Sequence, residues 1–159
     1  MKNLIIPNEI FIPQIKAFLD EGKTTTFRVR GYSMRLFLED RRDKVLLAPC
    51  RETPRKGDVI LAEVSPKRYV LHRVIKVEGT HLTLKGDGNV IGTEECETSD
   101  IIGIAKGFYR KGRAVPDMTT GTKWKIYSYL WLHLSPLRRW ILAFYRRIWL
   151  KIFPPKIEE

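Results

Sequence analysis

The sequence predicts a mainly β protein: an antiparallel β core with a short N-terminal helix before it and a basic, aromatic helical tail after it. Three observations support this prediction. Between residues 24 and 110, short apolar or alternating runs follow one another, separated by turn residues and without a helical run between them. On both sides of this region the apolar residues recur at helical spacing instead. A chain of 159 residues with 43% hydrophobic content suits a soluble globular domain with a real core.

The amino-terminal segment, residues 1–23, is expected to hold one short helix. In "PQIKAFLDEG", Ile15, Phe18 and Leu19 fall on one helical face, and Gly22 ends the helix. Pro7 and Glu9 interrupt the apolar run before it, well below the length of a secretory signal or a membrane span. The segment is also too short for a DNA-reading helix-turn-helix domain.

The central segment, residues 24–115, is expected to form the β core. Its strand-like runs are "TTTFRVRG", "KVLLAPC", "KGDVILAEV", "RYVLHRVIKV", "HLTLKG" and "DIIGIAKGFYR". The "EGT" between the fourth and fifth runs predicts a β-hairpin. Because no helix separates the runs, we expect an antiparallel sheet rather than a βαβ fold.

Cysteine and histidine usage predicts neither a disulfide framework nor a metal site. Cys50 and Cys96 lie far apart and lack the spacing of a zinc knuckle, so free thiols are expected. His72, His81 and His133 belong to different segments and suggest no zinc ligation.

Ser33 stands between a glycine and an apolar run in "GYSMRLFL". It is either a turn serine that hydrogen-bonds its own backbone or a nucleophile, and a nucleophile needs a base. His72 is a candidate base, or else a core histidine, because the period of two in "YVLHRVI" puts it on one face with Val70 and Val74. Three nearby lysines are alternative bases: Lys67, Lys85 and Lys76, the last of which shares the face of His72.

A carboxylate that could orient His72 is found in "KGDGN". The predicted hairpin turns the chain back, so that Asp87 can approach the strand of His72. The alternative is that Asp87 belongs to an ordinary Asp-Gly turn.

The order of "GYSM", "KGDVI", "YVLHRVI", "KGDGN" and "DIIGIAKGF" resembles the motif boxes of the type I signal peptidases. This serine peptidase superfamily also includes the self-cleaving LexA-type repressors, and the resemblance covers residues 31–108. Bacterial leader peptidases and LexA-type proteins have a lysine base where this chain has His72. The histidine resembles the archaeal, endoplasmic-reticulum and sporulation-type branch, which uses Ser-His chemistry.

The resemblance implies an antiparallel β fold and a role for each matching residue. Ser33 would be the nucleophile, with its own backbone N–H as an oxyanion donor, His72 the general base, and Asp87 the orienting acid. In the Ser-His branch the acid usually lies beyond the Gly-Asp-Asn box, which makes Glu94 and Glu95 alternatives. Leu36 stands where the family has a proline, and the family's usual amino-terminal membrane anchor is not expected here.

The carboxyl-terminal segment, residues 116–159, is expected to be a linker followed by a basic amphipathic helical tail. The net charge of the chain is +11, and residues 118–159 hold eight Lys or Arg against two Asp or Glu, together with all four tryptophans. The longest run without Lys or Arg has 12 residues, against the roughly 20 that span a bilayer. An in-plane interfacial helix needs this mixture of cations and aromatic rings. The alternative is a helical hairpin folded back on the β core.

The residues of the tail expected to contact the membrane are aromatic or basic: Trp131, Arg138, Arg139, Trp140, Arg146, Arg147 and Trp149. The sequence thus favours a serine endopeptidase that is peripheral to a membrane, on its cytoplasmic face, and cleaves signal or leader peptides. It would need no metal or cofactor and would bind no specific nucleic acid. The alternatives are a LexA-like autoproteolytic regulator and a catalytically inactive protein that binds membrane or nucleic acid.

Overall fold

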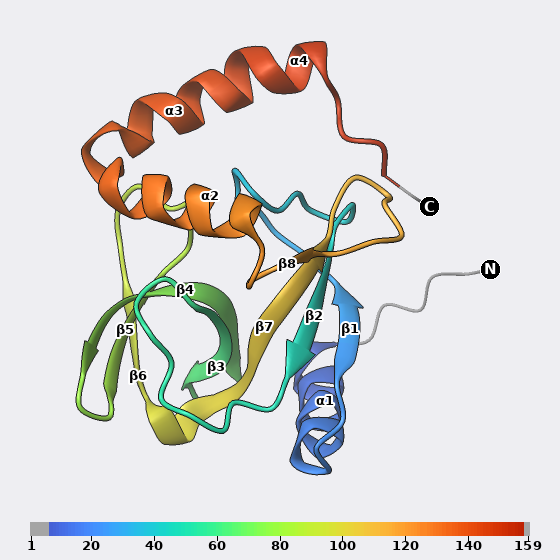
Figure 1. Cartoon of the computed structure of the whole chain (residues 1–159), viewed down its shortest axis with the longest axis vertical. Helices are drawn as coiled ribbons and strands as arrows, with labels where there is room; N and C mark the ends of the chain where they lie inside the picture. Colours follow the sequence, from blue (N-terminus) through green and yellow to red (C-terminus); the bar gives the residue numbers. More distant parts are fainter. Residues whose placement is uncertain (1–6, 158–159) are drawn as a thin grey trace.

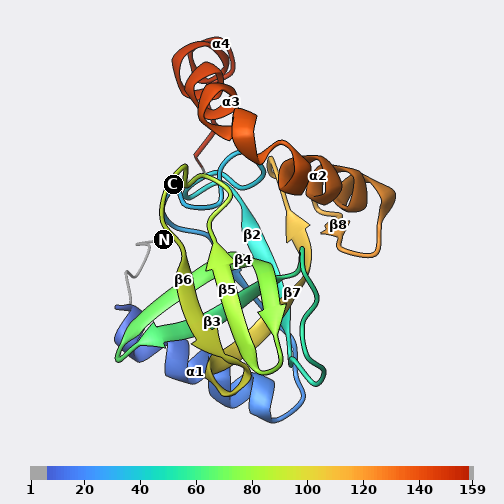
Figure 2. The same ribbon diagram turned by 90° about the vertical axis from the view of Figure 1, so that its left-hand side faces the viewer.

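The structure of the protein, a computed structural model, describes residues 7–157. Figure 1 shows a β body with helix α1 at one end and the remaining helices at the other, and Figure 2 shows the same division from the side. The strands are β1 (Thr25–Arg28), β2 (Lys44–Ala48), β3 (Val59–Ser65), β4 (Arg68–Glu78), β5 (His81–Lys85), β6 (Glu94–Glu97), β7 (Ile101–Tyr109) and β8 (Asp117–Met118). The helices are α1 (Asn8–Asp20), α2 (Thr122–His133), α3 (Arg138–Phe144) and α4 (Leu150–Ile152), with shorter 3₁₀ turns at Thr98–Asp100 and Ser135–Leu137 and a π-helical turn at Tyr145–Trp149.

The strands form one antiparallel sheet in the order β1-β2-β7-β3-β4-β5-β6, with β8 paired to β7. The antiparallel sheet and the hairpin between β4 and β5 are confirmed, the latter with Glu78 opposite His81. Each of the strand-like runs of the sequence contains one strand.

Helix and strand are about equally abundant, so the expectation of a mainly β protein underestimates the helical content. About 30% of the chain is helical and 31% is strand, a mixed α/β composition. The difference arises in the carboxyl-terminal segment, which forms α2 and then a nearly continuous helical run from residue 135 to residue 152. We call residues 135–152 the helical arm. No helix of the described residues is long and apolar enough to cross a bilayer.

Helix α1 begins five residues before the predicted stretch, because Ile12 adds a turn that is buried against the sheet. Ile15 and Leu19 are buried with it, as their spacing predicts, whereas Phe18 is exposed. Gly22 follows the helix with a positive φ of 80°, a conformation that glycine adopts without steric cost. The apolar run at residues 4–6 lies outside the described residues.

Helix α2 is joined to the β body by a chain of aromatic contacts. Trp124 is buried between Phe37, whose ring centre lies 4.9 Å away, and Phe108 on β7, at 4.6 Å. Tyr127 packs on Phe37 at 4.6 Å and on Trp131 at 5.9 Å. Because each buried aromatic pair adds roughly 0.5–1.5 kcal/mol beyond the burial of its area, these contacts attach α2 firmly to the core. The first part of the tail therefore folds back on the body.

Candidate active site

Ser33 lies in the connection between β1 and β2, and this connection runs at the end of the body that faces the C-terminal helices (Figure 1). Its side chain is half-buried, and the loop after it is anchored by Met34, Phe37 and Leu38, which are buried in the core. The backbone N–H of Gly31 donates to Oδ1 of Asp40 at 2.7 Å, which closes the loop on itself. A serine on a turn fixed by apolar anchors keeps a defined position while remaining accessible.

The "KGDGN" segment after β5 packs directly on the Ser33 loop. The N–H of Gly88 donates to the carbonyl oxygen of Ser33 at 2.7 Å. A methyl group on Gly86 would clash with this same oxygen and would lie 3.1 Å from Nε2 of His72. A methyl group on Gly88 would clash with the carbonyl oxygen of Tyr32. The two glycines therefore permit a close backbone approach that a side chain would block, and the carbonyl oxygen of Ser33 and Nε2 of His72 lie on the same side of Gly86.

His72 lies on β4, buried to 4% exposure, and its partner is Glu94 on β6. Nδ1 of His72 is 2.8 Å from Oε2 of Glu94. When Glu94 is ionised it accepts this hydrogen bond, so Nδ1 carries the proton and the lone pair of Nε2 remains free to accept another. Nε2 is the atom that lies next to Gly86 and the Ser33 loop.

Glu94 and Glu95 are consecutive residues of β6, so their side chains point to opposite faces of the sheet. The side chain of Glu94 is only 15% exposed and also lies 3.5 Å from Nη2 of Arg68. Glu95 points the other way, is mostly exposed, and lies 3.3 Å from Nε2 of His81. Glu94 alone of the two contacts His72.

Asp87, the acid expected first, contacts Arg73 instead of His72. Its carboxylate is completely buried and accepts two hydrogen bonds from the guanidinium, at 2.7 and 2.8 Å. The hydroxyl of Tyr127 donates a third, at 2.9 Å. The cause is strand alternation, because Arg73 faces the opposite side of β4 from His72 and draws Asp87 to that side. The expected contact between Asp87 and His72 is therefore not formed, whereas Glu94, one of the two alternatives for the acid, contacts His72.

Arg73 is a residue that the sequence did not single out. It is completely buried, and its remaining donor, Nη1, bonds the carbonyl of Gly57 at 2.9 Å and the hydroxyl of Ser128 at 2.7 Å. Burial lowers the pKa of its guanidinium, but attraction to Asp87 outweighs burial and leaves the pKa above its usual value. The one available signal was a charged residue in the middle of an otherwise buried strand.

The hydroxyl of Ser33 and Nε2 of His72 form no hydrogen bond within residues 7–157. In enzymes without substrate such bonds are often long and tighten only when the substrate is bound. The backbone N–H of Ser33 likewise donates to no acceptor in the described part of the chain, so it is available to a ligand.

The alternative lysine bases are engaged elsewhere or exposed. Nζ of Lys76 is 2.8 Å from Oε1 of Glu78, and both side chains are mostly exposed. Nζ of Lys85 donates to the carbonyl of Val90 at 3.1 Å. Lys67 is exposed in the turn between β3 and β4. His72 is thus the base candidate that the structure places against the Ser33 loop.

The residues expected to contact a membrane divide into a buried and an exposed group. Trp131 and Arg138 are buried: the indole N–H of Trp131 donates to the carbonyl of Asp87 at 3.2 Å, and the Arg138 guanidinium lies over the Trp131 ring. Both are packed against the body and cannot insert into a lipid interface. The other five are exposed on the helical arm: Arg139, Trp140, Arg146, Arg147 and Trp149.

A hollow beside α1 is not part of this site. It encloses about 500 Å³ and is lined by Phe11, Phe27 and Leu71, among others. Leu71 faces the opposite side of β4 from His72, so the hollow lies across the sheet from the histidine.

No protein-family model matches the chain, and no curated protein matches it either. A function for the chain therefore depends on the geometry of its own residues.

Proposed function

We propose that the chain is a serine endopeptidase in which Ser33 is the nucleophile, His72 the general base and Glu94 the acid that orients it. One observation carries the proposal: His72 is hydrogen-bonded through Nδ1 to a carboxylate while Nε2 faces the loop of a half-buried serine. Acyl transfer by a serine needs an acid and a base in this order beside the nucleophile, which supports the proposal. It also agrees with the antiparallel core and the motif order that resemble the Ser-His branch of the signal peptidases.

In the proposed reaction, Nε2 of His72 takes the hydroxyl proton of Ser33 as the oxygen attacks a peptide carbonyl. Glu94 stabilises the resulting imidazolium through Nδ1–H. The imidazolium then protonates the leaving amine, and water, deprotonated by His72, hydrolyses the acyl-enzyme. The backbone N–H of Ser33, which donates to no acceptor among residues 7–157, would donate to the oxyanion.

The substrate class follows from the resemblance and from the helical arm. We propose that the enzyme cleaves signal or leader peptides at a membrane surface, which it contacts through the arm. Support comes from the exposed apolar side chains of the arm, including Trp140, Phe144, Ile148 and Ile152, interleaved with exposed arginines. The arm and the Ser33 loop lie at the same end of the molecule (Figures 1 and 2), which would hold the site near peptides that emerge from a bilayer.

A serine-directed covalent probe, such as a fluorophosphonate, tests the proposed chemistry. We expect the unaltered chain to form a covalent adduct at Ser33, detected by intact-mass and peptide mass spectrometry, and the Ser33→Ala variant to form none. The Ser65→Ala variant is the matched control, because Ser65 is an exposed serine at the end of β3 and should not affect labelling. A chain that binds membranes but is never labelled would instead be the inactive binding protein.

The identity of the acid is tested by comparing neighbouring glutamates. Glu94→Gln removes the charge that orients His72, so the labelling rate should fall by roughly 10²- to 10⁴-fold, as when the carboxylate of a catalytic triad is neutralised. Glu95→Gln, which changes the same charge on the opposite face of β6, should label at nearly the normal rate. Equal rates in the two variants would remove Glu94 from the mechanism.

A further inference from the structure

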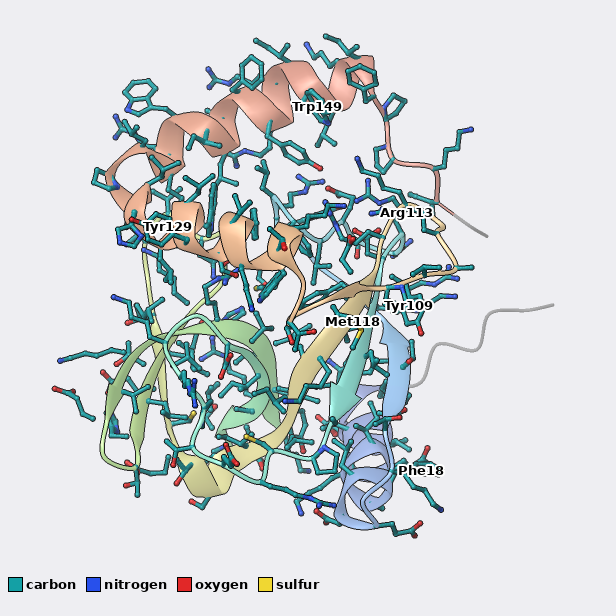
Figure 3. The ribbon with its side chains drawn as sticks, viewed as in Figure 1. Phe18, Tyr109, Arg113, Met118, Tyr129 and Trp149 are labelled. Atoms are coloured by element: carbon teal, nitrogen blue, oxygen red, sulfur yellow. The ribbon has the colours of Figure 1, made fainter. Side chains whose placement is uncertain are left out.

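Two adjoining hollows lie between the helical arm and the loops below it. The first encloses about 290 Å³ and the second about 580 Å³. They share Arg42, Lys111 and Trp149, so we treat them as one feature, the basic cleft. Leu36, three residues after Ser33, also lines it, which places the cleft beside the candidate active-site loop. Figure 3 shows Trp149 on the helical segment and Arg113 on the loop between β7 and β8 below it.

Among residues 7–157, the charged side chains that line the basic cleft are all cationic: Arg42, Arg110, Lys111 and Lys156. Arg42 and Arg110 are partly neutralised by Asp43, at 2.7 Å, and Asp117, at 3.4 Å. Lys111 and Lys156 form no ion pair with any residue from 7 to 157. Partial burial, followed by repulsion from Arg110 and Arg42, lowers the pKa of Lys111. The cleft thus holds positive charge that an anion would relieve.

The wall opposite these cations is apolar and aromatic. Phe144 and Trp149 line the cleft, and Trp149 packs on Phe153 with ring centres 4.7 Å apart. All three rings remain about half exposed, and they continue onto the outer surface of the arm. A free inorganic anion would leave this wall in contact with water, whereas an amphiphile would cover it.

We propose that the basic cleft binds the headgroup of an anionic phospholipid, with the phosphodiester against Arg42 and Lys111 and the first part of the acyl chains along Phe144, Trp149 and Phe153. The volume suits a headgroup and glycerol rather than a whole lipid, so the chains would continue into the bilayer on which the arm lies. This inference rests on the proposed membrane association, and it adds that the surface must be anionic. The bound lipid would then contact the loop segment that carries Leu36, close to Ser33.

The test compares binding of the full chain to phosphatidylcholine vesicles with and without phosphatidylglycerol, measured by co-sedimentation at low salt. The double variant Lys111→Asn/Lys156→Gln removes two cations that line the cleft, and asparagine tolerates the positive φ of 56° at residue 111. We expect its affinity for the anionic vesicles to fall roughly 30-fold, about fivefold for each cation. Lys16→Gln/Lys76→Gln removes the same charge from two exposed lysines outside the helical arm and should bind nearly as the unaltered chain does.

A soluble short-chain phosphatidylglycerol, below its micelle concentration, separates a cleft from general surface attraction. We expect it to shift the NMR signal of the Trp149 indole in the unaltered chain but not in the Lys111→Asn/Lys156→Gln variant. A shift seen equally with inorganic phosphate, or with short-chain phosphatidylcholine, would overturn the assignment of an anionic lipid. If the chain binds anionic vesicles but the NMR signal of the Trp149 indole does not shift, the attraction acts through the arm alone. This result would also overturn the proposal that the cleft binds lipid. Covalent labelling of Ser33 is measured separately, so failure of the peptidase proposal is distinguishable from failure of this one.

Discussion

Ser33→Ala and His72→Ala should each reduce peptide cleavage on the order of 10⁴- to 10⁶-fold, and the double variant should lose little more. The reason is that the hydroxyl and the imidazole act as one unit: without the base the serine is not activated, and without the serine the base has nothing to activate. The measurement is cleavage of a mixed peptide library by the unaltered chain and each variant, followed by mass spectrometry.

His81→Ala is the matched control for the histidine, since His81 is an exposed residue of β5 paired with Glu95 and Glu97. It should cleave at the normal rate. Each variant must also show the thermal unfolding transition of the unaltered chain, because His72 is buried and its loss could act through stability. Two separate, additive losses of activity in a folded chain would contradict a joint role for Ser33 and His72.

The strands could be predicted from the sequence where their own residues alternate or form apolar runs, and not elsewhere. β6 was missed because "EECE" is polar and short, with only Cys96 buried. It becomes a strand by pairing with β5, so that its structure depends on a neighbour and not on its own propensity. β8 has two residues and pairs only with β7, and no local pattern marks it.

Ser33 and His72 could be proposed from the order of the motifs, but the acid could not. The choice between Asp87 and Glu94 depends on which face of β4 each carboxylate meets, and this is set by the register of β4, β5 and β6. A buried cation on the opposite face, Arg73, takes the nearer carboxylate. A pairing of two charges far apart in the sequence leaves no trace in the local pattern.

The tail shows the same limit. Its spacing predicts aromatic and basic helices, but not which rings are buried, because each helical turn carries both kinds of residue. Trp131 and Arg138 are buried because they meet the "KGDGN" loop: Trp131 through the carbonyl of Asp87 and Arg138 through the carbonyl of Asn89, at 3.4 Å. The loop next to Ser33 therefore serves as the docking point of the tail. The folded-back alternative describes the buried face of the tail, and contact of its exposed face with a membrane stays a prediction.

Asp87→Asn should reduce the free energy of unfolding by about 3–5 kcal/mol, measured by urea denaturation. The substitution leaves the buried guanidinium of Arg73 without its counter-ion, and the low polarity around it makes an unpaired charge costly. Asparagine has one acceptor oxygen where Asp87 has two, so Arg73 and the Tyr127 hydroxyl would compete for that oxygen. Burial, followed by the negative charge of Asp87, raises the pKa of this hydroxyl well above its usual value, so it stays protonated and donates.

Asp20→Asn is the matched control, because Asp20 pairs with Lys16 on the exposed surface of α1. It should change the free energy of unfolding by less than about 0.5 kcal/mol.

Substitution of Asp87 and substitution of Glu94 should have opposite effects on stability and on labelling of Ser33. The Asp87→Asn variant should have a low free energy of unfolding. At a temperature where it is still folded, its Ser33 should be labelled faster than that of Glu94→Gln. The Glu94→Gln variant should keep its stability and lose its reactivity. A stable Asp87→Asn variant that fails to label would contradict the assignment of a purely structural role to Asp87.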